Sequence, residues 1–174
     1  IQWQKSYGGS WHDEAYGVAV TDDGYVVVGS TNSFGADYDD FWVLKLDSTG
    51  GIVWQKTYGG SGIDVAYGVV FDQAGENRHI VVVGDTSSFG AGGYDFWVLR
   101  LNLSTGEPIW QYTYGGSGDD LARSVAFAGD GYIVAGYTSS LGAGGDDFLV
   151  MKIDQGTAQW QKTFGGLWHD EAYG

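Results

Sequence analysis

The sequence repeats itself with a period of about 50 residues, and this repetition limits the folds open to it. A phrase of the form Trp-Gln-x-x-aromatic-Gly-Gly begins at Trp3, Trp54, Trp110 and Trp160. A second phrase, an aspartate followed by an apolar run with one basic residue, begins at Asp40, Asp95 and Asp147. Units of this length cannot bury their apolar surface alone and are typical of propellers, solenoids and stacked arrays.

Each unit contains four short segments of β-branched and aromatic residues, separated by turns of Gly, Asp, Ser and Thr, a pattern typical of strands. In the first unit we predict strands at Ala15–Val20, Tyr25–Ser30, Phe41–Leu46 and Ile52–Tyr58. No segment has a sustained helical period, so we expect almost no helix. The second and third segments are apolar on both faces and must therefore be covered from both sides.

These features predict an all-β fold, a β-propeller built of four-stranded antiparallel blades, with an open solenoid or stacked-sheet array as the alternative. We expect one repeat domain over residues 1–174, with blades at about 10–60, 61–116 and 117–166. A spare last strand is expected at 2–8 and a spare first strand at 167–174.

Closure of the ring requires more than this chain, because propellers usually have four to eight blades. The sequence of Trp11–Gly17 recurs unchanged at Trp168–Gly174, three units further on. We therefore expect three blades to be the period of a larger array, of which this chain is a piece, or of a ring or filament assembled from several chains.

The Trp-Gln-Lys-x-Tyr-Gly-Gly units resemble the propeller repeats of bacterial and archaeal secreted surface proteins. The turn and tryptophan of Leu46–Trp54 also look like the tryptophan-docking motif of quinoprotein propellers, although Asn102 replaces the aspartate in the second unit and the third unit is shorter. The resemblance implies an extracellular or cell-surface location. It also implies that one blade is locked to the next by Trp3, Trp54, Trp110 and Trp160.

Charge excludes some classes of partner. The chain has 8 basic and 22 acidic residues, a net charge of −14. A nucleic-acid binder needs a basic face, so that class is excluded. No apolar run is long enough for membrane insertion, and the absence of cysteine rules out disulfides and thiolate metal sites.

Most charged residues recur at equivalent positions, which favours structural roles over a unique active site. We expect the recurring aspartates to accept hydrogen bonds from turn N–H groups or to pair with a strand lysine. The residues concerned are Asp13, Asp64, Asp120 and Asp170, together with Lys45, Arg100 and Lys152.

The sequence predicts no cofactor other than calcium, for which it offers candidate ligands. Carboxylates in glycine-rich loops offer the oxygen ligands that Ca²⁺ prefers, although no complete EF-hand or nonapeptide pattern is present. The candidate ligands are Asp37, Asp39, Asp40, Asp95, Asp146 and Asp147.

Catalysis is not expected. The most enzyme-like cluster is Trp11-His12-Asp13-Glu14, because a histidine beside carboxylates could perform acid–base chemistry. These residues are adjacent in the sequence at the start of a predicted strand, where successive side chains point to opposite faces. We expect a non-enzymatic structural or adhesive surface scaffold that docks on copies of itself or on adjacent propeller repeats. The alternatives are a lectin-like propeller that binds glycans or peptides and, more remotely, a quinoprotein-like enzyme.

Overall fold

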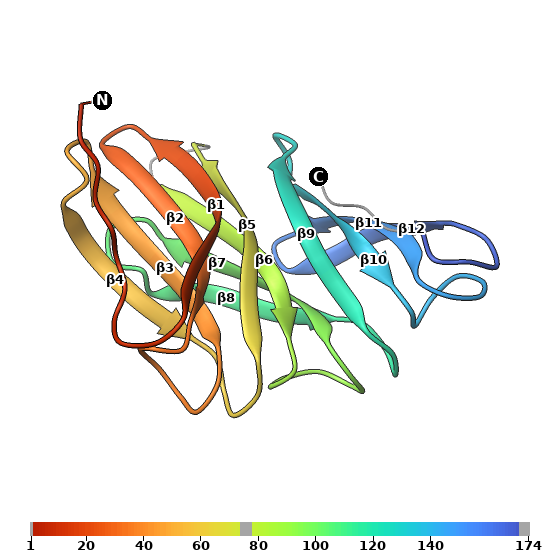
Figure 1. Cartoon of the computed structure of the whole chain (residues 1–174). Coiled ribbons are helices and arrows are strands. Elements are labelled where there is room, and N and C mark those ends of the chain that lie inside the picture. The colour runs from red at the N-terminus through yellow and green to blue at the C-terminus, as the bar shows by residue number, and fades with distance from the viewer. Residues whose placement is uncertain (1, 74–77, 171–174) are drawn as a thin grey trace.

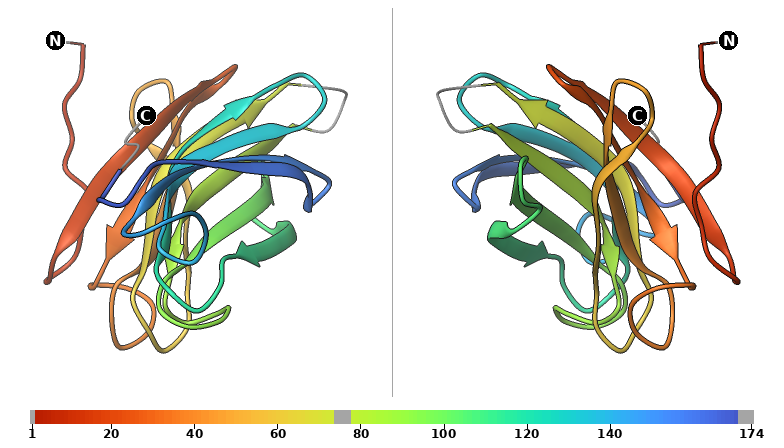
Figure 2. Two further views of the ribbon diagram at one scale, coloured as in Figure 1. Left: turned by 90° about the vertical axis from the view of Figure 1, so that its right-hand side faces the viewer. Right: turned by 90° about the vertical axis from the view of Figure 1, so that its left-hand side faces the viewer.

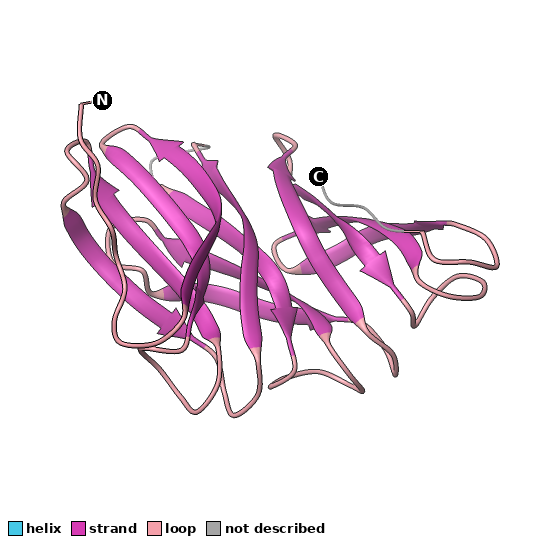
Figure 3. Ribbon diagram, viewed as in Figure 1, coloured by secondary structure: helices cyan, strands magenta, loops and turns pink. Residues whose placement is uncertain are grey.

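The computed structural model describes residues 2–73 and 78–170, which form twelve β-strands and no helix (Figures 1 and 3). The strands make three four-stranded antiparallel sheets, each formed by consecutive strands of one sequence unit. The prediction of an all-β repeat fold is therefore confirmed. Over the same residues the sheets stand side by side without closing into a ring (Figure 1).

Strand bounds follow the repeat. The first sheet contains β1 (Asp13–Thr21), β2 (Gly24–Thr31), β3 (Asp40–Asp47) and β4 (Ile52–Tyr58). The second contains β5 (Asp64–Asp72), β6 (His79–Thr86), β7 (Asp95–Asn102) and β8 (Pro108–Tyr114). The third contains β9 (Asp120–Phe127), β10 (Tyr132–Thr138), β11 (Asp147–Asp154) and β12 (Thr157–Phe164). The four strands predicted for the first unit are all present, and the first three extend by one or two residues at each end.

Turn chemistry explains where the strands end. Gly50 has φ of 75° in the turn between β3 and β4, a conformation that favours glycine, and Asp47 accepts hydrogen bonds from the N–H groups of Thr49 and Gly51. Between β1 and β2 the register shifts at Ala15/Gly17, and a side chain at Gly29 would lie 1.8 Å from the carbonyl oxygen of Glu14. The glycine thus allows the two strands to approach closely.

The three sheets pack face to face, and their first strands β1, β5 and β9 lie side by side (Figure 2). We call the contact between the first and second sheets the first interface, and that between the second and third sheets the second interface. One face of the second sheet lies in each, so Val81, Val82 and Val83 are all buried. The prediction that such strands are covered on both sides is confirmed for this sheet.

The N-terminal end of the chain differs from the expected spare last strand. Residues 2–8, here called the N-terminal segment, form no strand and lie along the outer face of the first sheet (Figure 2). Tyr7 of this segment packs against Trp42, Leu44 and Leu46. A last strand needs a third strand to pair with, and the described residues offer it none. Of the spare first strand expected at 167–174, residues 167–170 form no strand, but the positions equivalent to the body of β1 are 171–174, which lie outside the described residues, so this expectation stays a prediction. The described part of the chain has no helix long and apolar enough to cross a membrane.

Candidate functional site

The first interface is closed by side chains that reach from the last strand of one sheet to a turn of the next. Trp54 donates its indole N–H to the carbonyl oxygen of Leu103 at 2.9 Å, and Tyr58 donates its hydroxyl to that of Gly106 at 2.5 Å. Burial raises the pKa of the Tyr58 hydroxyl, so it remains a donor. These two bonds connect β4 to the turn between β7 and β8.

The second interface repeats one of these bonds. Tyr114, which is equivalent to Tyr58, donates to the carbonyl oxygen of Gly156 at 2.8 Å, and burial raises its pKa to about 12. The indole nitrogen of Trp110 is buried and has no hydrogen-bond partner among the described residues. Trp110 packs instead against the ring of Tyr132 at 6.5 Å between centroids.

The N-terminal segment makes the same two contacts with the first sheet. Trp3 donates to the carbonyl oxygen of Ser48 at 3.1 Å, and Tyr7 donates to that of Gly50 at 2.6 Å. The segment thus occupies the place that the last strand of a preceding sheet would take. Trp160 has no such turn to contact within the described residues and is 41% exposed.

Apolar packing gives each interface a second repeated feature. Phe41 of the first sheet is fully buried against Trp97 of the second, with ring centroids 4.6 Å apart. Phe96, at the equivalent position, is fully buried in the second interface. Phe148, the third member of this series, is only partly buried and lies against Phe164 of its own sheet. Sequence reasoning did not single out these phenylalanines, although each follows a recurring aspartate.

The aspartates that begin each first strand organise the loops at one end of the sheets. Asp64 accepts from the N–H of Gly60 at 3.0 Å, from the Ser88 hydroxyl at 2.7 Å and from the Thr86 hydroxyl. Equivalent sets surround Asp13 and Asp120, and Asp170 accepts from the N–H of Gly166 at 3.0 Å. Burial acts to raise the pKa of Asp13, but these hydrogen bonds outweigh it and leave that pKa below its usual value.

The basic residues of the third strands have other partners. Lys45, almost wholly buried, lies 2.8 Å from Asp23 and also donates to Thr21. Arg100 pairs with Asp72 at 3.2 Å, and Lys152 pairs with Asp130 at 2.8 Å. These contacts join the first hairpin of a sheet to its third strand, so the expected alternative of pairing with Asp13, Asp64 or Asp120 is not what the structure has.

Among the calcium candidates, Asp40, Asp95 and Asp147 are buried and accept from the N–H groups of Ala36, Ala91 and Ala143 at 2.6, 2.8 and 2.7 Å. Burial, with nearby carboxylates, raises the pKa of Asp40 and Asp95.

The three remaining calcium candidates have surroundings of a different kind. Asp37 is exposed, the carbonyl oxygen of Asp39 accepts from the N–H of Asp64, and Asp146 lies 2.9 Å from His169. The described residues contain no group of three or more His, Asp or Glu side chains arranged to hold a metal ion. Calcium binding therefore stays a prediction.

The Trp11-His12-Asp13-Glu14 cluster is divided between separate contacts. The backbone carbonyl of His12 accepts from Asn32, the carboxylate of Asp13 is surrounded by Thr31, Ser33 and Gly9, and Glu14 accepts from the hydroxyl of Tyr16. The structure thus brings none of these carboxylates to the His12 ring through a hydrogen bond that would prepare acid–base chemistry.

One polar cluster breaks the repeat and was missed in the sequence. Arg123 lies 3.4 Å from Asp85 across the second interface and stacks on the ring of Tyr67, 4.0 Å from its centroid, while donating to Tyr137. Burial raises the pKa of Asp85 to about 7, although Arg123 opposes the shift. A comparison of equivalent positions in the repeat could have revealed this cluster. Asp85 stands where the first unit has Ser30, and Arg123 stands where the first and second units have Tyr16 and Tyr67.

The two outermost sheet faces are the remaining candidate site. What we call the open face of the first sheet carries Val18 and Val20, which are exposed, and Val27, Trp42, Leu44 and Leu46, of which the last three are buried beneath the N-terminal segment. The open face of the third sheet carries Phe148, Val150, Trp160 and Phe164. Val20 is 71% exposed, whereas Phe71, its equivalent in the first interface, is 8% exposed. Phe164 is 56% exposed.

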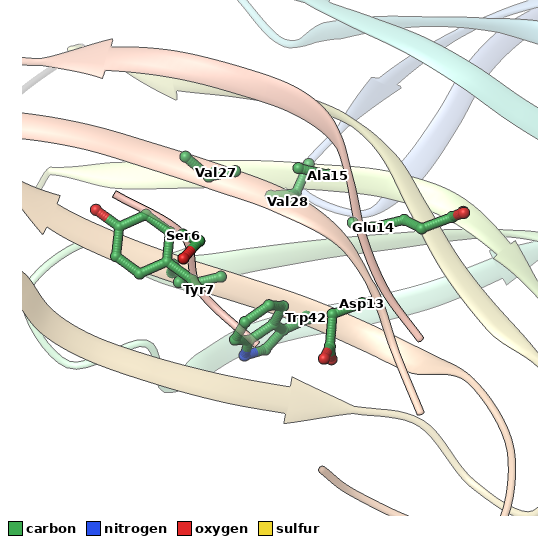
Figure 4. A pocket seen from close by; sticks show the side chains of 10 residues that line it. Ser6, Tyr7, Asp13, Glu14, Ala15, Val27, Val28 and Trp42 are labelled. Atoms are coloured by element: carbon green, nitrogen blue, oxygen red, sulfur yellow. The ribbon is translucent and has the colours of Figure 1, made fainter. Parts of the chain in front are cut away.

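A cavity of about 210 Å³ lies between the open face of the first sheet and the N-terminal segment (Figure 4). Tyr7 and Ser6 line it from the segment, and Val27, Trp42 and Leu44 line it from the sheet. The segment therefore covers this face incompletely.

Comparison with known proteins adds no relative. No protein-family model matches the sequence, and no curated protein matches it.

Proposed function

We propose that this chain is a non-enzymatic scaffold of β-propeller type, structural or adhesive, that acts at the cell surface or outside the cell. Its outermost sheets dock on further units of the same kind within a larger ring or filament. The propeller assignment is supported by the side-by-side first strands and by the repetition of one interface between successive four-stranded sheets.

One observation carries the proposal. Both interfaces within the chain combine a face bearing a buried phenylalanine with a face bearing the third-strand apolar residues of the next sheet. The open faces of the third and first sheets are the two unmatched halves of such an interface. They leave Val18 and Val20 exposed on the first sheet and Trp160 and Phe164 exposed on the third, and exposed apolar surface of this kind is typical of interaction sites.

Charge fits this role. The net charge of −14 opposes indiscriminate association, so that docking depends on matched faces. Most carboxylates of the loops at one end of the sheets are engaged in turn hydrogen bonds, which suits a rigid structural unit.

A tandem chain tests the proposal. Residues 1–167 are followed by 11–174, so that the repeated heptapeptide Trp11–Gly17 takes the place of Trp168–Gly174 and the third sheet of one unit precedes the first sheet of the next. We expect the tandem chain to unfold at a higher temperature than the single chain and in one transition. A tandem chain with the melting temperature of the single chain would refute docking between units.

Glycan binding is the second candidate, and the exposed rings of Trp11 and Trp168 favour it because such rings can stack on sugars. A glycan array tests it. Binding that disappears in Trp11→Ala and Trp168→Ala variants would support a lectin role, and an array without any bound glycan would reject it.

A further inference from the structure

We propose that the partner of the open first-sheet face is a second copy of this chain, whose Phe148 enters the cavity beside Trp42 and whose β12 displaces the N-terminal segment. This inference rests on the proposed function and deepens it by naming the partner, the contact and the segment that controls access.

The cavity has the position of a missing phenylalanine. At the first interface Phe41 packs on Trp97, the equivalent of Trp42, and its ring atom lies 2.8 Å from the place of a side chain at Gly84. Trp42 contacts Phe34, with ring centroids 5.6 Å apart, and it also lines the cavity, where no residue of the described chain takes the place that Phe41 has at Trp97. Figure 4 shows Trp42 facing this space beneath Tyr7.

The third sheet carries the matching side chain. Phe148 begins the same apolar phrase as Phe41 and Phe96, and its register partner Phe164 corresponds to Tyr58, the partner of Phe41. Phe148 is only partly buried, whereas its two equivalents are fully buried. A second copy thus offers a face with the residue types that already fill both interfaces of this chain, which is the continuity that a head-to-tail contact requires.

The N-terminal segment and the β12 of a second copy would compete for one place. Trp3 and Tyr7 already donate to the carbonyl oxygens of Ser48 and Gly50. Trp160 of a second copy can replace the first of these hydrogen bonds, whereas Phe164, which stands at the position of Tyr58, has no hydroxyl and would fill its place by apolar packing alone. The segment makes no strand pairing, whereas β12 is paired with β11 from Phe148 to Asp154. Displacing the N-terminal segment therefore breaks no strand pairing, whereas β12 stays paired with β11 in its own sheet. The N-terminal segment thus acts as a removable cover over the first sheet.

Sedimentation velocity of the full chain tests the inference, in 0.5 M NaCl because two copies with a charge of −14 repel each other at low salt. The double variant Trp3→Ala, Tyr7→Ala loosens the cover and is expected to associate at least tenfold more tightly than the wild type. Adding Phe148→Ala to that double variant is expected to abolish association. Tyr38→Ala, at an exposed position in the loop between β2 and β3, is the matched control and should leave association unchanged.

Two results would overturn the inference: a double variant that stays monomeric at about 1 mM, or association that Phe148→Ala leaves intact. Far-ultraviolet circular dichroism of each variant establishes that it is folded. If separate copies stay apart while the tandem chain gains stability, the second-copy inference fails and the proposed function stands. If the tandem chain gains nothing, the proposed function fails as well.

Discussion

Replacement of the equivalent phenylalanines gives an internally controlled test of the interfaces. Phe41 and Phe96 are fully buried between sheets, whereas Phe148 lies on an open face. Truncation of a fully buried phenylalanine to alanine costs about 3–5 kcal/mol, because transfer free energy is lost and a cavity is left. Phe41→Ala also loses the ring contact with Trp97 at 4.6 Å, so we expect a cost toward the upper end of that range.

Phe148→Ala should cost about 1 kcal/mol in the single chain, since its ring is already partly in water and its loss leaves no enclosed cavity. Urea unfolding followed by tryptophan fluorescence measures all three variants, and equal m-values would show that the same transition is compared. A stabilising osmolyte keeps the Phe41→Ala and Phe96→Ala proteins folded at the start of the titration. Equal losses for Phe41→Ala and Phe148→Ala would refute the assignment of a closed interface and an open one.

Three further predictions concern single contacts. Tyr58→Phe should lower the free energy of unfolding by about 1 kcal/mol, because the carbonyl oxygen of Gly106 loses its donor. Tyr38→Phe, at an exposed position, should change it by less than about 0.5 kcal/mol. Urea titration of the two variants measures both effects, and equal effects would contradict the role of the Tyr58 hydroxyl. Gly84→Ala should cost about 2 kcal/mol or more, since its Cβ would lie 2.0 Å from the carbonyl oxygen of Val65, and an unchanged midpoint would contradict the close approach of β5 and β6. Asp85 should make the protein more stable as the pH falls from about 7 toward 4, because its pKa is about 7 in the folded chain and near 3.8 when unfolded, so the folded state binds the extra proton. Its contribution is at most about 1.4 kcal/mol for each pH unit, and Asp85→Asn should remove that slope, whereas an Asn variant with the wild-type pH profile would exclude this group as its source.

Much of the fold could be predicted because its determinants are local. The strand ends depend on turn residues such as Gly24 and Gly50, and the repeat carries the same solution from one unit to the next. The burial of Val81–Val83 on both faces followed from the absence of any polar residue among them. The N-terminal segment could not be assigned correctly, because its sequence is that of a last strand and only the missing partner keeps it from pairing.

The candidate site depends on contacts between units and was less accessible. Lys45 and Asp23 meet because a hairpin and the next strand are neighbours, but the sequence alone did not indicate which aspartate a strand lysine would choose. The Asp85–Arg123 pair spans two sheets and departs from the repeat, so neither the period nor the spacing predicts it. Comparison of equivalent positions was the signal that could have drawn attention to it.

The central claim, that the open faces dock on further units, is tested most directly by thiol protection in the tandem chain. The protein has no cysteine, so Val20→Cys introduces a single reactive group, and its side chain is 71% exposed in the single chain. In the second unit of the tandem chain, position 20 should become as buried as Phe71, and alkylation should slow at least tenfold relative to the single chain. The same alkylation rate in both proteins would contradict the claim.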